Sequence, residues 1–312
     1  MLRLLRLALS ALAATFVLGG IAAAATTIFT LPTPGTATQI SSHIASSAKI
    51  TSIPKDLSPP LDEMSYDIMA NTKYHASGQG CPTVSPSCTY GNKTSKHLVV
   101  LFGDSHAWMW LAAVNPAVRR NNFRLQLLWR AGCPVATLPQ FPNAICNQWR
   151  SSTVALIRSE KPTLVLLSER TSHIHTAPSI FMTGAEWTAG LETTIAALKT
   201  ATTNVAVIGD IPVYVDTLNP VKCLGLFPTA VKKCSTSRLN SLPDWADASA
   251  AEKAAAVHEG AGFIDPKPWL CGESTCYEIV GKTSVYYDWS HIAATYSGYL
   301  AGVMGSKLHP FL

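Results

Sequence analysis

The residue types that together activate a hydroxyl nucleophile stand far apart in this sequence. Ser105 lies in LFGDSHAWMWLAAV, where a few small or polar residues interrupt two apolar runs. Asp288 and His291 are three residues apart in YYDWSH. A serine becomes a useful nucleophile beside a base that takes its proton and a carboxylate that orients this base. A carboxylate and an imidazole at that spacing lie side by side on one turn of structure, so we predict that His291 reaches Ser105.

His106 and Asp104 flank the serine but have plainer interpretations. Neighbouring side chains diverge, so His106 is a poor base for Ser105, and we expect it to pack against the site or to contact substrate. Asp104 is expected to accept backbone N–H groups at the turn or helix start. A Gly-Asp-Ser turn after a strand is common, and on its own it is a weak indication of catalysis.

Two further histidines and a tryptophan are candidates for the rim of the site. His173 and His175 follow a predicted strand, but neither has an acid at the spacing found for His291. We therefore expect them to contact substrate or to be exposed, with His173 as the candidate contact. Trp289 is expected to wall the cleft and contact substrate, although burial explains an aromatic residue there equally well.

The elements that must position these residues alternate along the chain. Runs such as LVVLF, TLVLL and NVAVIG are apolar throughout, as strands buried on both faces require. Their alternation with amphipathic runs predicts an α/β fold, a three-layer α/β/α sandwich with a mainly parallel five-stranded sheet. Ser105 follows the first strand, at the sheet edge where ligands bind. The predicted strands are His97–Gly103, Phe123–Leu128, Thr163–Ser168, Asn204–Gly209 and Gly262–Ile264. The predicted helices are Trp108–Arg120, Gln148–Ser159, Ala185–Thr200, Trp245–His258 and Ala293–Gly305.

Composition and charge exclude one class of partner. The chain has 312 residues, of which 47% are hydrophobic and 14% charged, and its formal net charge is +5. This is a globular composition, long enough for one large domain or two small ones. The positive charge is spread thinly, without a basic run that would bind a phosphate backbone, so we expect no nucleic-acid partner.

The N-terminal segment predicts export. Arg3 and Arg6 precede a long apolar stretch that ends in small residues. Residues 1–25 are therefore expected to be a signal peptide or a single membrane anchor, and no second spanning segment is expected. Residues 26–53 are rich in Pro, Ser and Thr and are expected to be a linker. The catalytic domain is expected over residues 54–312, in a periplasmic or secreted location.

The eight cysteines agree with export, since an oxidising compartment allows them to pair. They fall into four close couples, each bracketing a loop rich in Gly, Pro or Ser. Sequence does not determine connectivity, but local pairing is the simplest interpretation. A zinc site is the weaker alternative, because no C-x₂-C spacing repeats and no H-x₃-H follows, so we expect no metal. The expected disulfides are Cys81–Cys88, Cys133–Cys146, Cys223–Cys234 and Cys271–Cys276.

Taken in order, these motifs resemble a known family. FGDSHA is similar to the first block of the SGNH (GDSL-type) hydrolase superfamily, and DWSH is similar to its last block, D-x-x-H. The wider pattern is most similar to the extracytoplasmic SGNH domains attached to acyltransferase-3 membrane proteins. Shared features are a P-x-x-L-x-P-x-L entry at 54–61, a Cys pair ahead of GDSHA, Cys-Pro at 133–134, and a Cys pair before the YxDxxH segment at 286–291. The resemblance covers most of residues 54–305 and implies a flavodoxin-like fold.

The resemblance also implies roles for particular residues. It implies Ser105 as nucleophile, His291 as base and Asp288 as its orienting partner. It further implies an oxyanion hole formed by the backbone N–H groups of Ser105 and of Gly132 in RAGCP. The Asn of the superfamily's third block has no counterpart, because LLSERTSHIH occupies the equivalent strand end. We expect the Arg170 guanidinium to take its place as third donor.

The expected activity is that of an exported serine esterase or O-acyltransferase that needs no cofactor. Its expected substrates are O-acyl groups, acetyl above all, of cell-envelope polysaccharide, peptidoglycan or glycolipid, with transfer and hydrolysis both open. No acyltransferase-3 unit is recognised in the chain, so either a separate membrane acyltransferase-3 partner supplies acyl groups or the protein works alone as an esterase. The alternative is a non-catalytic glycan-binding or scaffold domain on an SGNH frame, against which the retained Ser, His and Asp argue.

Overall fold

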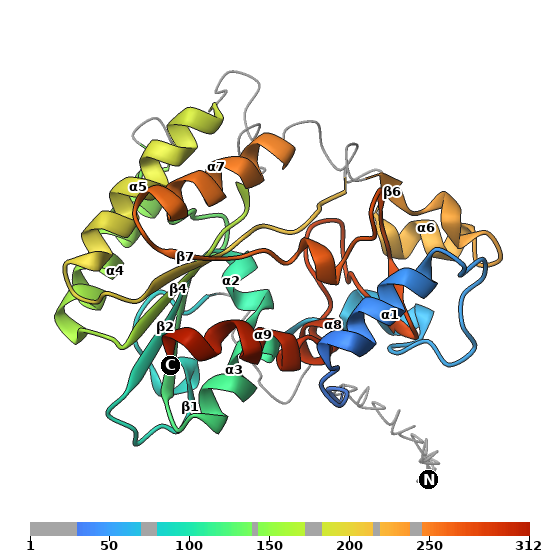
Figure 1. The fold of residues 1–312 in the computed structure, drawn as a ribbon, viewed down its shortest axis with the longest axis horizontal. Coiled ribbons are helices and arrows are strands. Elements are labelled where there is room, and N and C mark those ends of the chain that lie inside the picture. Colours follow the sequence, from blue (N-terminus) through green and yellow to red (C-terminus); the bar gives the residue numbers. More distant parts are fainter. Residues whose placement is uncertain (1–29, 70–79, 139–142, 172–182, 215–218, 238–244) are drawn as a thin grey trace, which may run out of the picture.

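A mainly parallel sheet forms the centre of the fold (Figure 1). The computed structural model describes residues 30–69, 80–138, 143–171, 183–214, 219–237 and 245–312, without the side chains of 86 and 245–248. The six strands of its main sheet lie side by side in the order β1 (Thr89–Gly91), β3 (Arg124–Trp129), β2 (Leu98–Gly103), β4 (Leu164–Ser168), β5 (Val205–Ile208) and β7 (Gly262–Ile264).

The five predicted strands are all present, and they are parallel to one another. The prediction of five strands was one short, because β1 pairs antiparallel with β3 at the edge of the sheet. β1 spans three residues, all half-buried, so it lacks the apolar run that marked the other strands. The predicted α/β/α sandwich with a mainly parallel sheet is confirmed.

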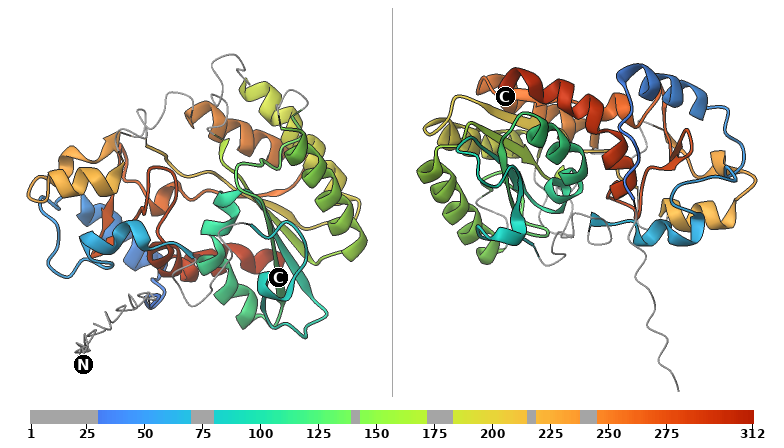
Figure 2. Two further views of the ribbon diagram at one scale, coloured as in Figure 1. Left: turned by 180° about the vertical axis from the view of Figure 1, so that it is seen from behind. Right: turned by 90° about the horizontal axis from the view of Figure 1, so that it is seen from below.

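Helices cover both faces of the sheet (Figure 2). Because successive strand residues point to opposite faces, β2 sends Val99 and Leu101 into one core and Val100 and Phe102 into the other. The first core is closed by α3 (Leu111–Arg120), α8 (Ala294–Tyr299) and α9 (Ala301–Leu308), and the second by α4 (Ala144–Glu160), α5 (Gly184–Lys199) and α7 (Trp245–His258).

Two predicted helices are each divided in the structure. The helix expected over Trp108–Arg120 is two helices, α2 (Ser105–Met109) and α3, with Trp110 between them. The first begins at Ser105 rather than at Trp108 because the Asp104 side chain caps it there. The helix expected over Ala293–Gly305 is divided in the same way, into α8 and α9.

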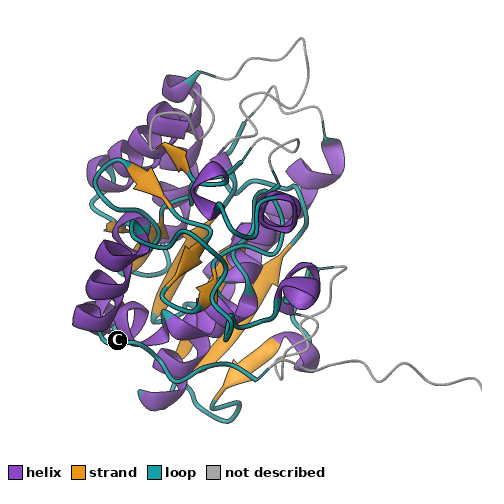
Figure 3. Ribbon diagram, turned by 90° about the vertical axis from the view of Figure 1, so that its right-hand side faces the viewer, coloured by secondary structure: helices purple, strands orange, loops and turns teal. Residues whose placement is uncertain are grey.

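A smaller lobe lies beside the sheet, on the right in Figure 1 and facing the viewer in Figure 3. Short helices and two-stranded ribbons build it around a separate apolar cluster that includes Leu57, Met64, Leu224 and Ile279. Its elements are η1 (Leu61–Tyr66), α6 (Pro220–Leu226), η6 (Val231–Lys233), β6 (Thr236–Ser237) paired with β8 (Thr275–Cys276), and β9 (Ile279–Val280) paired with β10 (Thr283–Ser284). The remaining short helices are η3 (Pro86–Cys88), η7 (Lys267–Trp269) and η8 (His309–Phe311).

The expected linker of residues 26–53 contains a packed helix, α1 (Ala37–Ser47). Thr36 and Gln39 form a capping box at its start, and Ile40 and Ile44 are buried against the rest of the molecule. The part of this segment that forms α1 therefore belongs to the folded body and is not the spacer that its composition predicted.

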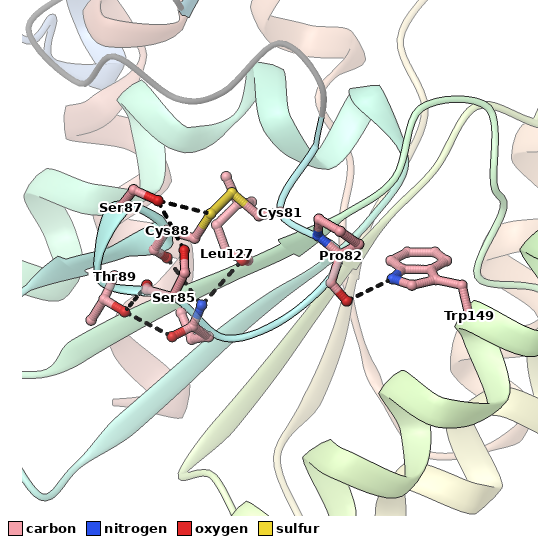
Figure 4. Close-up of a disulfide and its surroundings, with 9 residues drawn as sticks. Cys81, Pro82, Ser85, Ser87, Cys88, Thr89, Leu127 and Trp149 are labelled. Atoms are coloured by element: carbon pink, nitrogen blue, oxygen red, sulfur yellow. Dashed lines mark hydrogen bonds between the residues drawn. A yellow bond between two sulfur atoms is a disulfide. The ribbon is translucent and has the colours of Figure 1, made fainter.

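The four predicted disulfides are present, which leaves none of the eight thiols to bind zinc. Figure 4 shows how the Cys81–Cys88 bridge fastens the segment before β1. On one side Thr89 Oγ1 donates to Gln126 Oε1 of β3 at 2.9 Å, and on the other Trp149 Nε1 of α4 donates to the Pro82 carbonyl at 3.1 Å. This disulfide therefore fastens its loop to the sheet.

Within the described part of the chain, no helix combines the length and the apolar character needed to span a bilayer. Residues 1–25, where a signal peptide or anchor was expected, lie outside the described residues.

Candidate active site

The turn between β2 and α2 places Ser105 at the carboxyl edge of the sheet. Asp104 Oδ1 accepts the His106 backbone N–H at 2.8 Å, which caps α2. Its Oδ2 accepts the Arg170 backbone N–H at 2.9 Å, which ties the turn to the end of β4. The expectation that Asp104 is structural is therefore confirmed.

Gly103, the last residue of β2, allows this turn to lie against β4. A Cβ at position 103 would come 1.7 Å from the carbonyl oxygen of Ser168, far inside any permitted contact. Glycine is therefore required where the chain leaves the strand and enters the turn that carries the serine.

A tight loop before α8 carries the predicted acid and base. Tyr286 and Ile292 form an antiparallel bridge, and the loop between them holds Asp288 and His291. His291 Nε2 lies 2.8 Å from Ser105 Oγ, and His291 Nδ1 lies 2.8 Å from Asp288 Oδ2. Because an ionised carboxylate only accepts hydrogen bonds, Nδ1 carries the proton and Nε2 accepts from the serine hydroxyl. The structure thus brings together the residues that the sequence singled out.

Asp288 is held as a carboxylate. Its Oδ1 accepts the backbone N–H groups of Ser290 at 2.7 Å and of His291 at 2.8 Å. Burial alone would raise the pKa of Asp288, but the hydrogen bond and charge interaction with His291 and these N–H groups outweigh burial and lower it. The side chains keep some exposure, 27% for Asp288 and 16% for His291, so the base remains accessible to a substrate.

Tyr287 is a neighbour of the base that the sequence analysis did not identify. Its ring stacks on the His291 ring with centroids 5.4 Å apart and an interplanar angle of 17°. Its backbone N–H also donates to the His291 carbonyl at 3.3 Å. These contacts restrict the imidazole orientation. The only signal for it in the sequence was its position next to Asp288.

The loop after β3 positions Gly132. Cys133 N–H donates to the Arg130 carbonyl at 3.1 Å, which closes a turn in which Gly132 has a φ of +66°. That conformation favours glycine. The Cys133–Cys146 disulfide fastens the loop to α4, and a Cβ on Gly132 would meet no atom within 4 Å. The predicted oxyanion role of the Gly132 N–H group stays a prediction.

Glu169, directly after β4, binds the loop that follows β3 and carries Gly132. Its Oε2 accepts the backbone N–H groups of Val135 at 2.5 Å and Ala136 at 3.0 Å, and its Oε1 accepts Trp187 Nε1–H at 3.1 Å. Burial raises the pKa of Glu169 to about 8. This carboxyl was missed by the sequence analysis, because its partners lie on other elements.

Arg170 and Trp289 meet at the edge of the site. The guanidinium carbon lies 4.3 Å from the centroid of the Trp289 ring, a cation–π geometry. Burial lowers the pKa of Arg170, against the opposing effect of the negative charges on Asp210, Asp104 and Asp288. The expectations that Arg170 donates to an oxyanion and that Trp289 contacts substrate stay predictions.

His106 is not placed as a substrate contact. Its side chain has no exposed surface, and its Nδ1 lies 2.6 Å from Asp210 Oδ1. The start of α2 turns this side chain inward, so it packs behind the site instead of lining it. His173 and His175 lie outside the described residues, and the expected substrate contact of His173 stays a prediction.

Asp210, which the sequence analysis did not single out, has several hydrogen-bond partners in the structure. Its Oδ2 accepts both the N–H and the Oγ1–H of Thr171, at 2.9 and 3.0 Å. Its place after β5, beside the end of β4, was the available signal, because the carboxyl ends of parallel strands share one edge.

Comparison with known proteins adds a family and a fold. A family model described as the SGNH domain fused to AT3 domains matches residues 72–305. No match to the chain is found among curated proteins. The periplasmic domain of a lipopolysaccharide acetyltransferase from Salmonella ser. Paratyphi A has a TM-score of 0.55 and 16% identity, over 70% of this chain and 85% of that chain. This likeness shows that the two chains share a fold.

Two other solved structures have lower scores. A GDSL-like lipase from Bacteroides thetaiotaomicron has a TM-score of 0.45 and 12% identity, over 70% of this chain and 90% of that chain. A catalytic mutant of an acetylxylan esterase from Geobacillus stearothermophilus has a TM-score of 0.45 and 11% identity, over 69% of this chain and 94% of that chain.

Proposed function

Because the chain belongs to the family of SGNH domains that are fused to AT3 domains, we propose that it is a serine enzyme that cleaves or transfers O-acyl groups of a carbohydrate. One observation carries the proposal: a hydrogen-bonded path runs from Ser105 Oγ through both ring nitrogens of His291 to Asp288, in two steps of 2.8 Å. A hydroxyl, an imidazole and a carboxylate in this order are the groups that perform acyl transfer through an acyl-enzyme.

The first half-reaction forms the acyl-enzyme. Ser105 Oγ attacks the acyl carbonyl carbon while His291 Nε2 takes its proton, and the carbonyl oxygen becomes an oxyanion. Asp288 stabilises the imidazolium through Nδ1. When the tetrahedral intermediate collapses, the bond to the leaving alcohol breaks and His291 returns the proton to that alcohol oxygen. The acyl group is then an ester of Ser105.

The second half-reaction releases the acyl group. Water or a sugar hydroxyl gives its proton to His291 Nε2 and attacks the ester carbonyl. Collapse of the second intermediate returns the proton to Ser105 Oγ. Water as acceptor yields a carboxylic acid, and a sugar hydroxyl yields a newly acylated sugar, so the acceptor decides between hydrolysis and transfer.

The proposed oxyanion donors lie on three elements. The Ser105 N–H group stands at the start of α2, where the helix dipole favours negative charge. The Gly132 N–H group belongs to the turn after β3, and the Arg170 guanidinium follows β4. Donors held in advance at such positions stabilise developing charge more than freely rotating water does.

The proposed substrate is an acetylated glycan of the cell envelope: polysaccharide, peptidoglycan or glycolipid. The fusion named for the family supports an acyl supply from a separate membrane acyltransferase-3 protein. The lipopolysaccharide acetyltransferase named for the Salmonella structure supports a carbohydrate acceptor. Four disulfides support an extracytoplasmic location, since they persist in oxidising compartments.

The test is turnover of p-nitrophenyl acetate by the purified full chain and by its Ser105→Ala variant. We expect release of p-nitrophenol by the wild-type protein and only the background rate with Ser105→Ala. The variant removes one hydroxyl from a site already held by Asp104, so its circular dichroism spectrum should match that of the wild type. Equal rates in the two folded proteins would contradict the proposal.

The same pair of proteins addresses the non-catalytic alternative. A glycan-binding or scaffold domain would show no turnover with either protein and would bind acetylated polysaccharide equally with and without the Ser105 hydroxyl. Transfer is separated from hydrolysis by adding a sugar acceptor and following the acetylated sugar by mass spectrometry.

A further inference from the structure

A second histidine–aspartate pair lies directly behind the first. His106 and Asp210 both have side chains that are fully buried, and His106 Nδ1 lies 2.6 Å from Asp210 Oδ1. The His106 ring meets the His291 ring edge to face, with centroids 5.0 Å apart and an interplanar angle of 64°. No step of the mechanism above uses this pair.

The pair joins four elements. His106 belongs to α2, and Asp210 follows β5. Asp210 Oδ1 also accepts the Ile211 N–H at 2.8 Å, while Oδ2 accepts the two donors of Thr171 after β4. The Asp210 N–H in turn donates to Glu252 Oε2 on α7 at 2.8 Å. The surface that His106 presents to His291 is therefore fixed.

A histidine at position 106 buries a polar ring nitrogen that packing alone does not require. His106 Nε2 is buried and has no hydrogen-bond partner among the described residues. A buried polar atom left unpaired destabilises a fold. A leucine or phenylalanine would fill the space behind His291 without this penalty, so the polarity of His106 indicates a role in the site.

The two carboxylates beside His106 favour its protonated form. The groups facing His106 are Asp210 after β5, Asp104 in its own turn, Arg170 after β4 and His291 on the loop before α8. Burial alone would lower the pKa of His106, and Arg170 acts in the same direction. The charge and hydrogen bond of Asp210, with the charge of Asp104, outweigh both and raise it.

We propose that His106 is a positioning residue for His291: fixed by Asp210, it supports the His291 ring against Ser105 and disfavours a second positive charge beside it. This inference rests on the proposed function, since it assigns a role relative to the same base. It differs from the Ser105–His291–Asp288 path, because His106 touches neither the reacting hydroxyl nor the substrate side.

The test compares pH profiles of His106→Asn, Asp210→Asn and wild type. Asparagine at 106 keeps a donor near the place of Nδ1 for Asp210 but carries no ring and no charge. We expect the acid limb of the kcat/KM profile to move to higher pH by about one unit in His106→Asn, because a nearby cation is lost and Asp210 is left unbalanced. The limb should move less in Asp210→Asn. That variant removes the carboxylate and with it the main interaction that keeps His106 protonated, so both charges of the pair disappear. In His106→Asn, kcat at the optimum should fall about tenfold, because general base catalysis depends on geometry.

A second readout does not need turnover. In the Ser105→Ala background, the C–H signals of histidine imidazoles report by NMR the pH at which His291 becomes protonated. The same upward shift is expected there when His106→Asn is added. If the wild-type protein releases no p-nitrophenol, the proposed function fails, and this titration still decides the inference.

The matched control is His258→Gln. His258 lies at the end of α7 with 70% of its side chain exposed, where it contacts Glu192. The His258→Gln substitution should change neither the pH profile of kcat/KM nor the NMR titration of His291. Circular dichroism checks that His106→Asn and Asp210→Asn are folded. If their acid limbs and NMR midpoints then coincide with those of the wild type, the inference is overturned. A fall in kcat without any shift would likewise reduce His106 to a packing residue.

Discussion

His291 Nε2 lies 2.8 Å from Ser105 Oγ, although 186 positions separate the two residues in the chain. The parallel sheet delivers the serine at the end of β2, and the loop before α8 delivers the histidine. Because the same loop holds Asp288, the base and its orienting carboxylate reach the serine as one unit. The chemistry of the site therefore depends on how these two segments are supported, and each support gives a prediction.

Replacing Asp288 by Asn should abolish most of the activity while keeping the fold. The amide cannot accept from Nδ1–H as a carboxylate does, so the imidazole loses its preferred tautomer and the stabilisation of its cation. We expect kcat on p-nitrophenyl acetate to fall by up to about 10⁴-fold with KM little changed. Steady-state kinetics check this. A kcat within a factor of two of the wild type would remove Asp288 from the mechanism.

Replacing Arg170 by Gln tests the third oxyanion donor. If the guanidinium stabilises the developing charge, kcat should fall by about 10²-fold or more, with a smaller change in KM. Arg170→Lys keeps a positive charge but not the planar guanidinium, so its kcat should lie between those of the wild type and Arg170→Gln. An unchanged kcat in Arg170→Gln would show that the oxyanion is stabilised by backbone N–H groups alone.

Gly103→Ala should destabilise the protein. The added methyl group would lie 1.7 Å from the Ser168 carbonyl oxygen, so β2 and β4 must separate at the base of the serine turn. We expect the free energy of unfolding to fall by at least about 1–3 kcal/mol, measured by urea denaturation. Gly225→Ala in α6 is the control, because its Cβ would meet no atom within 4 Å and alanine favours a helix. Equal losses in both variants would contradict the packing argument.

Stability should decrease as the pH rises from about 4.5 to 7, and Glu278→Gln should flatten this decrease. Glu278 is buried and accepts from Tyr214 Oη at 2.6 Å and Ser235 Oγ at 2.9 Å. Burial, against these hydrogen bonds, raises its pKa to about 7 from a usual value of 4.5. The folded protein therefore keeps a proton there that the unfolded chain releases, so the stability present below the unfolded pKa is lost as the pH rises through the folded one.

Urea denaturation at pH 5 and pH 8 checks this dependence. The two hydroxyl partners of Glu278 can rotate to suit an amide, so Glu278→Gln should lose less stability than the wild type between these pH values. Glu273→Gln is the control, since that side chain is exposed in the same region. A wild-type protein that is more stable at pH 8 than at pH 5, with Glu278→Gln unchanged, would refute the assignment.

Local patterns predicted the parts of this fold that depend on neighbouring residues. The five predicted strands are the parallel strands of the sheet. The runs LVVLF, TLVLL and NVAVIG indicated three of them, because burial on both faces leaves a continuous signal in the sequence. The three-residue β1 has no such run. In α1, composition pointed to a linker, yet Thr36 and Gln39 already form a capping pattern and Ile40 and Ile44 already have helical spacing. That helix was predictable from signals that the composition obscured.

The site divides in the same way. Ser105, Asp288 and His291 have residue types and spacings that indicate their chemistry in the sequence itself. His106 and Asp210 are 104 positions apart, and their pairing arises only when β2 and β5 come to lie on either side of β4. Glu169 likewise acts through backbone N–H groups of another loop, which leave no trace in residue type. Long-range contacts of this kind need the topology.

The most direct test of the central claim is reaction of the full chain with a serine-reactive phosphonate, followed by peptide mass spectrometry. A single adduct is expected on Ser105, with labelling that weakens at acid pH as the base is protonated and with no adduct in Ser105→Ala. Labelling of a different serine, or equal labelling of the wild type and Ser105→Ala, would contradict the assignment of Ser105 as the nucleophile.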